Sequence, residues 1–413
     1  MSAATPRGLG SAVLLGAGIV LIAANLRPAI ASVATVLDQL HAGLGLSATG
    51  AGILNALPVI FFGLGAPVAP LLSRRVGIER ALLVALAALI AGAALRLGPS
   101  QVLLFTGTII LGGGIAIANV LLPGLVKRDF PHRIGLMSGL YTTSLAAAAS
   151  LAAATTVPLG DALDLGWRGP MGVWIVPAVL ALLVWLPQIR RARPCQETRP
   201  RARNGPSLLR NPLAWRFTVF MGLLSLTYHT VLAWLPSIYT AYGVDAVTAG
   251  ALLSVATIGA TPVTLVLPAL ASRVRDQRWW VGGLTAVTAV GLVGLLVVPT
   301  AAPYLWAGLI GLGMGAAFPL GLTLITLRTR TGEDATALST MSQSFGYLVA
   351  GLGPLAVGVL HDVTGSWTPT VAVLLVLLVP QLLAGLAAAR DRFIEPRPRI
   401  AATEDPARAT TAV

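Results

Sequence analysis

Apolar residues run along this chain in stretches of about 20 or more, separated by short polar segments. An α-helix needs ~20 apolar residues to cross a bilayer, whereas a membrane β-strand shows about ten residues of alternating polarity. Because no alternating pattern appears, we predict an all-α membrane protein with twelve transmembrane helices. The expected spans are 11–37, 46–72, 78–97, 101–126, 134–157, 169–189, 213–240, 246–270, 279–298, 304–327, 335–360 and 368–389.

Composition agrees with this class. Of the 413 residues, 56% are hydrophobic and only 10% are charged, which does not fit a soluble globular domain. The first apolar run continues past residue 27 without a small-residue cleavage site, so we expect a retained span and no signal peptide. The sole cysteine, Cys195, cannot form an internal disulfide or a metal cluster. We therefore expect neither a metal nor a cofactor.

The positive charges are distributed unevenly. The net charge is +13, with 28 Lys and Arg residues. With the spans above, all of them except Arg27, Arg96 and Arg168 fall on one side of the membrane. This positive-inside pattern predicts a multi-pass protein of the plasma (inner) membrane with both termini in the cytoplasm. The charge then sets orientation and does not indicate nucleic-acid binding. The expected partners are the lipid bilayer and a small-molecule substrate, with a monomer as the functional unit.

The longest polar link divides the chain. Residues 190–212 are basic and broken by proline, which is typical of a flexible linker. This cytoplasmic linker separates an N-terminal six-helix bundle, 1–189, from a C-terminal one, 213–390. Residues 391–413 are rich in Pro, Arg, Ala and Thr and are predicted to form a disordered cytoplasmic tail.

The two bundles repeat one another in sequence. At a constant offset of 201, Gly107, Leu111, Gly112, Gly114 and Ala116 recur as Gly308, Leu312, Gly313, Gly315 and Ala317. At an offset of 198, Pro70 and Arg75 recur as Pro268 and Arg273. Two six-helix halves of the same topology are typical of transporters that rock about a site between the halves.

Arg27, within the stretch 25–28, is the first candidate for substrate binding. It is the one ionised side chain near the middle of an expected span, and no acidic residue lies at a comparable depth. An arginine there costs about 3 kcal/mol and normally faces a bundle interior or a wet cavity, and Pro28 loosens the helix by removing a backbone donor. On a continuous helix Ala23 and Ala31 would share its face, leaving volume or allowing close packing. The solute is therefore expected to supply the counter-charge. Alternatively, Arg27 snorkels or binds carbonyls of a neighbouring helix.

Other candidates are polar or aromatic residues within spans. On the seventh span, Tyr228 and Trp234 offer an aromatic wall, and His229 could move a proton or remain a neutral, packed imidazole. The aromatics could instead be interface anchors.

Central helices of each half must line a midplane cavity, which favours further polar positions on the fourth, fifth and eleventh spans. These could alternatively bond helix to helix without touching a substrate. The residues are Asn119, Tyr141, Gln343 and Tyr347.

Two enzyme-like readings fail. The glycines at 112–114 and at 311, 313 and 315 resemble nucleotide loops, but they lie inside apolar helices with no strand before them. Intramembrane catalysis would need paired carboxylates, clustered histidines or a serine with a base, and the four histidines are scattered. We therefore expect that the chain is not an enzyme.

Four stretches carry a family resemblance. They are 25–28 with Ser32-Val33, 112–119 continuing through Leu122-Pro123 to 126–131, 135–141, and 230–236. Together they resemble the major facilitator superfamily and, within it, the cyanate/2-nitroimidazole transporter family, over essentially the whole membrane portion. The resemblance implies two pseudo-symmetric bundles (the major facilitator fold), alternating access, and a small substrate such as cyanate or a nitroimidazole.

One motif departs from the superfamily. Its loop between the second and third helices usually reads Gly-x-x-x-Asp-Arg-x-Gly, but here Arg74 stands at the Asp position, before Arg75. The acid needed for a cytoplasmic gate is then missing, although Glu79 could substitute. The expected gate residues are Arg74, Arg75, Glu79 and Arg273.

Two transport hypotheses follow. In the first, a small anion, cyanate-like or a small carboxylate, binds Arg27. Uptake of a negative charge against ~100 mV costs about 2.3 kcal/mol, so it needs a co-transported proton, an exchanged anion or removal of the product. In the second, a neutral or weakly charged heteroaromatic compound such as a nitroimidazole is exported after stacking on Tyr228 and Trp234.

Overall fold

The computed structural model describes residues 9–34, 36–46, 48–163, 166–190, 208–259 and 261–394. The helices of the first half are α1 (Leu9–Ala24), α2 (Pro28–Ala34), α3 (Leu37–Leu44), α4 (Ala48–Gly65), α5 (Val68–Val76), α6 (Ile78–Leu95), α7 (Gln101–Asp129), α8 (Ile134–Leu163), α9 (Arg168–Gly172) and α10 (Ile175–Arg190). Those of the second half are the 3₁₀ helix η1 (Leu208–Arg210), α11 (Pro212–Ala241), α12 (Ala246–Ile258), α13 (Thr261–Ala271), α14 (Arg278–Val297), α15 (Pro303–Leu327), α16 (Gly332–Thr364) and α17 (Thr368–Ala388).

The all-α membrane architecture is confirmed. Within the described residues, eleven helices are long and apolar enough to cross a membrane, or up to twelve if the bent pair 57–65 and 68–76 forms one span. The two parts of that pair meet at 51°. The predicted linker 190–212 lies mostly in 191–207, outside the described residues.

The first span is broken, which corrects the prediction of one continuous helix. α1 ends at Ala24, and the amides of Asn25 and Leu26 turn back to Ile22 O and Ala23 O at 3.0 and 3.1 Å. The break follows from Pro28, which cannot donate a backbone hydrogen bond and whose ring clashes with the preceding turn, yet suits the first position of a new helix. Arg27 therefore lies in the break, not on a continuous face shared with Ala23 and Ala31.

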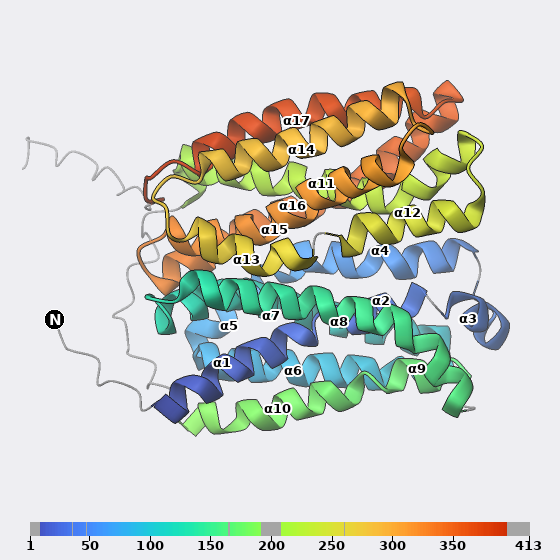
Figure 1. Cartoon of the computed structure of the whole chain (residues 1–413). Helices are drawn as coiled ribbons and strands as arrows, with labels where there is room; N and C mark the ends of the chain where they lie inside the picture. The colour runs from blue at the N-terminus through green and yellow to red at the C-terminus, as the bar shows by residue number, and fades with distance from the viewer. Residues whose placement is uncertain are drawn as a thin grey trace, which may run out of the picture.

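The two halves form two layers (Figure 1). The blue-to-green helices, up to α10, occupy the lower part of that view, and the yellow-to-red helices, from α12 to α17, occupy the upper part. We call the end of the bundle that carries Arg74, Arg128 and Arg273 the basic end. In Figure 1 it lies at the left, where α1 begins and α10 ends.

The halves pack together at the basic end and in the middle. α16 lies against α4 and α7, and α8 lies against α13. Glycines allow this approach, since a Cβ on Gly139 would lie 2.5 Å from Leu265 O and one on Gly124 would lie 2.9 Å from Gly332 O. Toward the opposite end, α12 packs against α11 and α15 of its own half. The span formed by α12 and α13 thus joins the other half mainly through α13, its part at the basic end.

The residues after α17 dock back onto the basic end. Ile394 is fully buried, and its amide donates to Arg328 O at 2.7 Å. The Arg328 guanidinium in turn contacts Ala389 O at 2.8 Å and the Asp391 carboxylate at 3.2 Å. The sequence predicted a disordered tail at 391–413, but 391–394 are packed against the end of α15. The contacts of Arg328 with Ala389 O and Asp391 and the Ile394 amide bond to Arg328 O hold them there. Residues 395–413 lie outside the described residues.

Candidate functional site

Arg27 lies between the two halves. Its backbone carbonyl accepts the first hydrogen bonds of α2, from Ile30 N and Ala31 N at 3.0 Å. Its side chain is only partly buried. The guanidinium forms no hydrogen bond or ion pair with any residue that the structure describes. Its charge instead acts on Tyr228, His229 and Tyr347 of the other half.

The neighbouring Asn25 is held separately. Its side-chain amide donates to Leu21 O at 2.8 Å and to Pro177 O of α10 at 3.1 Å. Asn25 therefore bonds backbone and fastens the end of α1 to α10. Neither of these hydrogen bonds involves the side chain of Arg27.

The three residues on which the charge of Arg27 acts belong to a cluster of aromatic rings. The rings of Tyr228 and His229 on α11 are perpendicular, with centroids 5.5 Å apart, and His229 is 6.5 Å from Tyr347 on α16. Tyr347 also meets Phe62 of α4 at 5.3 Å, edge to face. We call these four residues, Phe62, Tyr228, His229 and Tyr347, the aromatic cluster. It joins both halves beside the break in the first span.

The protonation pattern of His229 follows from its contacts. Its Nδ1 lies 2.7 Å from the Ser225 carbonyl oxygen. A carbonyl only accepts, so Nδ1 carries the proton and Nε2 keeps a lone pair when the ring is neutral. Nε2 is therefore the atom that can take up a proton.

Three further predicted residues are Tyr141, Gln343 and Asn119. Tyr141 interacts with Tyr347 of the cluster, and Gln343 bonds Asn119. Tyr141 on α8 is buried, interacts electrostatically with Tyr347, and its hydroxyl has no hydrogen-bond partner within the described part of the chain. Gln343 on α16 donates to Ser339 Oγ at 2.7 Å and to Asn119 O at 3.2 Å. It therefore links α16 to α7 through the backbone of Asn119, whose own side chain stays partly exposed.

Trp234 is directed elsewhere. Its indole N–H donates to Pro354 O of α16 at 2.9 Å, and its ring lies 5.2 Å from that of Trp367. The indole N–H is therefore hydrogen-bonded and the ring is packed, both within the second half. Its position differs from that of Tyr228, which interacts with Arg27.

The four predicted gate residues have different environments. Arg74, Arg75 and Arg273 are exposed, whereas Glu79 is buried at 6% exposure. Glu79 Oε1 accepts from Arg128 at 2.6 Å. The same guanidinium bonds Asp129 at 2.7 Å. Glu79 thus ties the start of α6 to the end of α7.

Three buried or half-buried arginines are absent from the residues that the sequence predicted for the site or the gate. Arg128 and Arg96 lie at helix ends, where hydropathy alone does not say whether a side chain turns inward. Arg328 is 4% exposed and bonds Gln277. The repeat carried a usable signal, since Glu79 and Arg128 correspond to Gln277 and Arg328 at offsets of 198 and 200. Arg96 departs from the positive-inside pattern, but so does the exposed Arg168, so that signal does not tell a buried arginine from an exposed one.

The described residues contain no group of three or more His, Cys, Asp or Glu side chains placed to hold a metal ion. The site is thus built from one guanidinium, aromatic rings, hydroxyls and amides. Such groups bind and orient a small polar or anionic molecule through hydrogen bonds and stacking.

Comparison with known proteins gives close relatives. Residues 9–354 match the family described as Major Facilitator Superfamily. The chain is 42% identical over 378 residues to "Uncharacterized transporter YycB" of Bacillus subtilis (strain 168), covering 91% of this chain and 94% of the relative. It is 40% identical over 383 residues to the "2-nitroimidazole transporter" of Escherichia coli (strain K12), covering 92% and 97%. It is 33% identical over 350 residues to the "Cyanate transport protein CynX" of the same organism, covering 84% and 90%.

Solved structures match over nearly the full length. FucP in its outward conformation aligns with a TM-score of 0.70 at 15% identity, covering 92% of this chain and 99% of that one. The proton:xylose symporter XylE aligns with a TM-score of 0.74 at 13% identity, covering 94% and 99%. At these identities the likeness concerns the fold alone.

Proposed function

Because the chain belongs to the major facilitator superfamily, and so is a multi-pass membrane transporter related to nitroimidazole and cyanate transporters, we propose that it carries a small anion. The substrate is cyanate-like or a small carboxylate, and Arg27 binds its negative group. It crosses the plasma membrane by alternating access, with the basic end and both termini on the cytoplasmic side.

The observation that carries this proposal is the unpaired guanidinium of Arg27. It lies between the halves, partly accessible, without an ion pair among the described residues, and its charge acts on side chains of the opposite half. A buried charge is stabilised by an opposite charge or by water. A substrate anion would provide the opposite charge and would displace water from the guanidinium.

The surrounding groups suit a small, flat or linear anion. Tyr228 and Tyr347 present rings and hydroxyls to the same region as Arg27. The Tyr141 hydroxyl has no partner among the described residues and so remains free to donate. Asn119 and Gln343 add amide groups, so the proposed pocket has contributions from α7, α8, α11 and α16.

Energetics require coupling if the direction is uptake. Moving one negative charge inward against about 100 mV costs about 2.3 kcal/mol, roughly a fifty-fold concentration ratio. A proton carried on His229 Nε2, next to Tyr228 and Tyr347, would cancel that charge. An exchanged anion would do the same without His229.

Substitution of Arg27 tests the proposal. Arg27→Ala should weaken anion binding by about 10- to 100-fold, the loss of a charge-assisted hydrogen bond. Arg27→Lys should retain part of the affinity, because it keeps the charge but not the planar fork. The measurement is a thermal-shift titration of purified protein with cyanate and small carboxylates.

The matched control is Arg168→Ala, which removes an exposed arginine that stacks on Trp167 and donates to Leu97 O. It should bind anions like the wild type. If Arg27→Ala bound every tested anion with wild-type affinity, Arg27 would have no role in recognition and the proposal would fail.

A second candidate function is export of a neutral or weakly charged heteroaromatic compound, such as a nitroimidazole. The aromatic cluster favours it, with Tyr228 and Tyr347 as stacking surfaces and Trp234 left in its contacts with Pro354 and Trp367.

Flux into proteoliposomes with charged and uncharged analogues separates the two functions. For the second function, Tyr228→Leu should abolish flux of the neutral compound while Arg27→Gln preserves it. Loss of flux in Arg27→Gln alone would favour the anion.

A further inference from the structure

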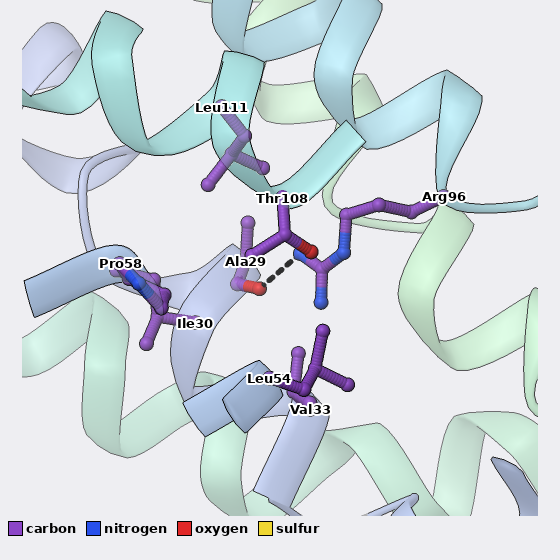
Figure 2. A pocket seen from close by; sticks show the side chains of 8 residues that line it. All are labelled: Ala29, Ile30, Val33, Leu54, Pro58, Arg96, Thr108 and Leu111. Carbon is purple, nitrogen blue, oxygen red and sulfur yellow. Dashed lines mark hydrogen bonds between the residues drawn. The ribbon is translucent and has the colours of Figure 1, made fainter. Parts of the chain in front are cut away.

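Arg96 holds the start of α2 from a neighbouring helix. It follows the last residue of α6 and is only 2% exposed. One terminal nitrogen of its guanidinium donates to Ala29 O in α2 at 2.6 Å, the bond drawn in Figure 2. The stem of the side chain lies against α7, since a Cβ on Gly107 would come within 2.8 Å of Arg96 Cγ. Arg96 therefore connects the start of α2 to the packed pair of α6 and α7.

Asn25 holds the other side of the break in the first span. Its side chain is 3% exposed and donates to Leu21 O at 2.8 Å and to Pro177 O of α10 at 3.1 Å. Asn25 lies two residues before Arg27, and Ala29 lies two residues after it. The segment that carries Arg27 is thus anchored on both sides to helices of its own half.

The charge of Arg96 has no counterpart among the described residues. The guanidinium forms no ion pair with them, and its Nε and second terminal nitrogen find no hydrogen-bond partner there. Arginine stays charged in proteins, and a buried charge without an opposite charge destabilises the folded state. An apolar side chain of similar length would fill the same space without that penalty. Packing alone therefore does not account for an arginine at this position.

We propose that Arg96 and Asn25 are positioning residues for Arg27. They fix the two sides of the break and so hold the backbone from which the Arg27 guanidinium reaches the anion. The strength of a charge-assisted hydrogen bond depends on its direction, so a shifted backbone weakens binding even when the charge is kept. This inference rests on the proposed function, in which Arg27 is the residue that binds the anion.

The test is a double-mutant cycle on the purified full chain, with cyanate as the probe and affinity taken from thermal-shift titration. Arg96→Met removes the donor and keeps an unbranched side chain. We expect it to weaken cyanate binding by about 10-fold. Without cyanate, its unfolding midpoint should lie within about 2 °C of the wild type or above it, because the lost charge was unpaired.

The second arm of the cycle repeats Arg96→Met in a chain that carries Arg27→Ala. No further loss of affinity is expected there, because a residue that acts through Arg27 has nothing left to position. If Arg96 instead attracted the anion directly, the two losses would add. Additive losses would therefore overturn the inference.

Further variants separate positioning from folding. Asn25→Leu removes the other anchor, should also weaken binding only when Arg27 is present, and decides the question if Arg96→Met does not fold. Arg96→Lys keeps a donor and should recover part of the affinity. Arg168→Met, at an exposed arginine of the same end that bonds Leu97 O, is the matched control and should bind cyanate like the wild type.

The same measurements distinguish this inference from the proposed function. Wild-type affinity in both Arg96→Met and Asn25→Leu would overturn the positioning role, and the proposed function would still stand if Arg27→Ala lost binding. Wild-type affinity in Arg27→Ala would overturn the proposed function and the positioning role with it.

Discussion

The carboxylate of Glu79 is buried at the basic end, where it bonds Arg128 at 2.6 Å. The equivalent place in the second half is taken by Gln277, whose Oε1 accepts from Arg328. Both side chains do the same job, joining the start of one helix to the end of the next. Only the first pair carries opposite charges.

This comparison predicts the response to substitutions at Glu79. Glu79→Gln should destabilise the fold by about 1 kcal/mol or less, because an amide oxygen can still accept from Arg128 as Gln277 does for Arg328. Glu79→Leu should cost more, about 2 to 3 kcal/mol, because it leaves a half-buried guanidinium with Asp129 alone. Thermal unfolding of the two variants in detergent checks the order.

A matched control is Glu333→Gln, an acid in the first turn of α16 that is not buried. It should unfold like the wild type. Equal destabilisation by Glu79→Gln and Glu79→Leu would show that the charge of Glu79, and not its hydrogen bond, stabilises this contact.

At the level of single residues, the sequence indicates that a charged side chain is special only when it stands within an apolar stretch. Arg27 stands inside an apolar run and could be singled out. Arg96 and Arg168 both stand at span ends, yet Arg96 is buried and Arg168 is exposed. The difference arises from α2, whose Ala29 carbonyl gives Arg96 an inward partner, and no local pattern encodes that contact.

The third and fourth spans of the first half illustrate how helices are matched to one another. α6 and α7 pack through glycines, since a Cβ on Gly107 would lie 2.5 Å from Gly92 O and one on Gly92 would lie 2.6 Å from Gly107 O. α14 and α15 repeat the arrangement, with a Cβ on Gly291 3.0 Å from Trp306 O. The glycine motifs therefore serve close packing.

Gly107→Ala should destabilise the protein by about 1 to 3 kcal/mol, because the added methyl group overlaps the backbone of α6. Gly113→Ala, on the same helix with nothing within 4 Å of its Cβ, should be neutral or slightly stabilising. Unfolding midpoints of the two variants test the pair. Similar midpoints for both would contradict the packing argument.

The number of membrane spans was predictable from the sequence, but the continuity of the helices within them was not. Each span is an apolar run of sufficient length, so twelve runs gave the architecture. Whether a proline breaks a helix depends on whether the backbone carbonyl that loses its N–H donor finds another partner. Pro58 and Pro123 lie within α4 and α7, whereas Pro28 begins α2. The same residue type therefore gives a tolerated proline in one place and a new helix in another.

For the whole molecule, the contact between halves at the basic end depends on small residues. α8 approaches α13 at Gly139, whose position would bring a Cβ within 2.5 Å of Leu265 O. Thr143 and Thr264 meet 3.3 Å apart along the same seam. A bulkier residue there must push the halves apart at this end.

Gly139→Ala should therefore shift the population toward a state closed at the opposite end. The measurement is the distance between spin labels at Gln101 and Tyr304, exposed positions at that end, in a chain carrying Cys195→Ser. We expect the distance distribution to move to shorter values. Gly283→Ala, whose Cβ would meet nothing within 4 Å, is the control and should leave it unchanged. An unaltered distribution in folded Gly139→Ala would rule out this seam as the determinant.

The repeat in the sequence was enough to predict two halves, because residues at constant offsets occupy equivalent helices. It could not predict at which end the halves meet, since the repeat makes both halves alike and the energy difference between closed ends comes from contacts between them. The Gln343 bond to Asn119 O and the glycine approaches at α7 and α8 are contacts of that kind.

The docked segment after α17 has a practical consequence for shortened or tagged versions of the protein. A chain cut after Ala389 loses Asp391 and the buried side chain of Ile394, so it uncovers Arg328 and the end of α15. A chain cut after Ile394 retains both anchors. Fusion partners and affinity tags are therefore best joined beyond Ile394, and a boundary drawn by hydropathy at the last helix would be too early.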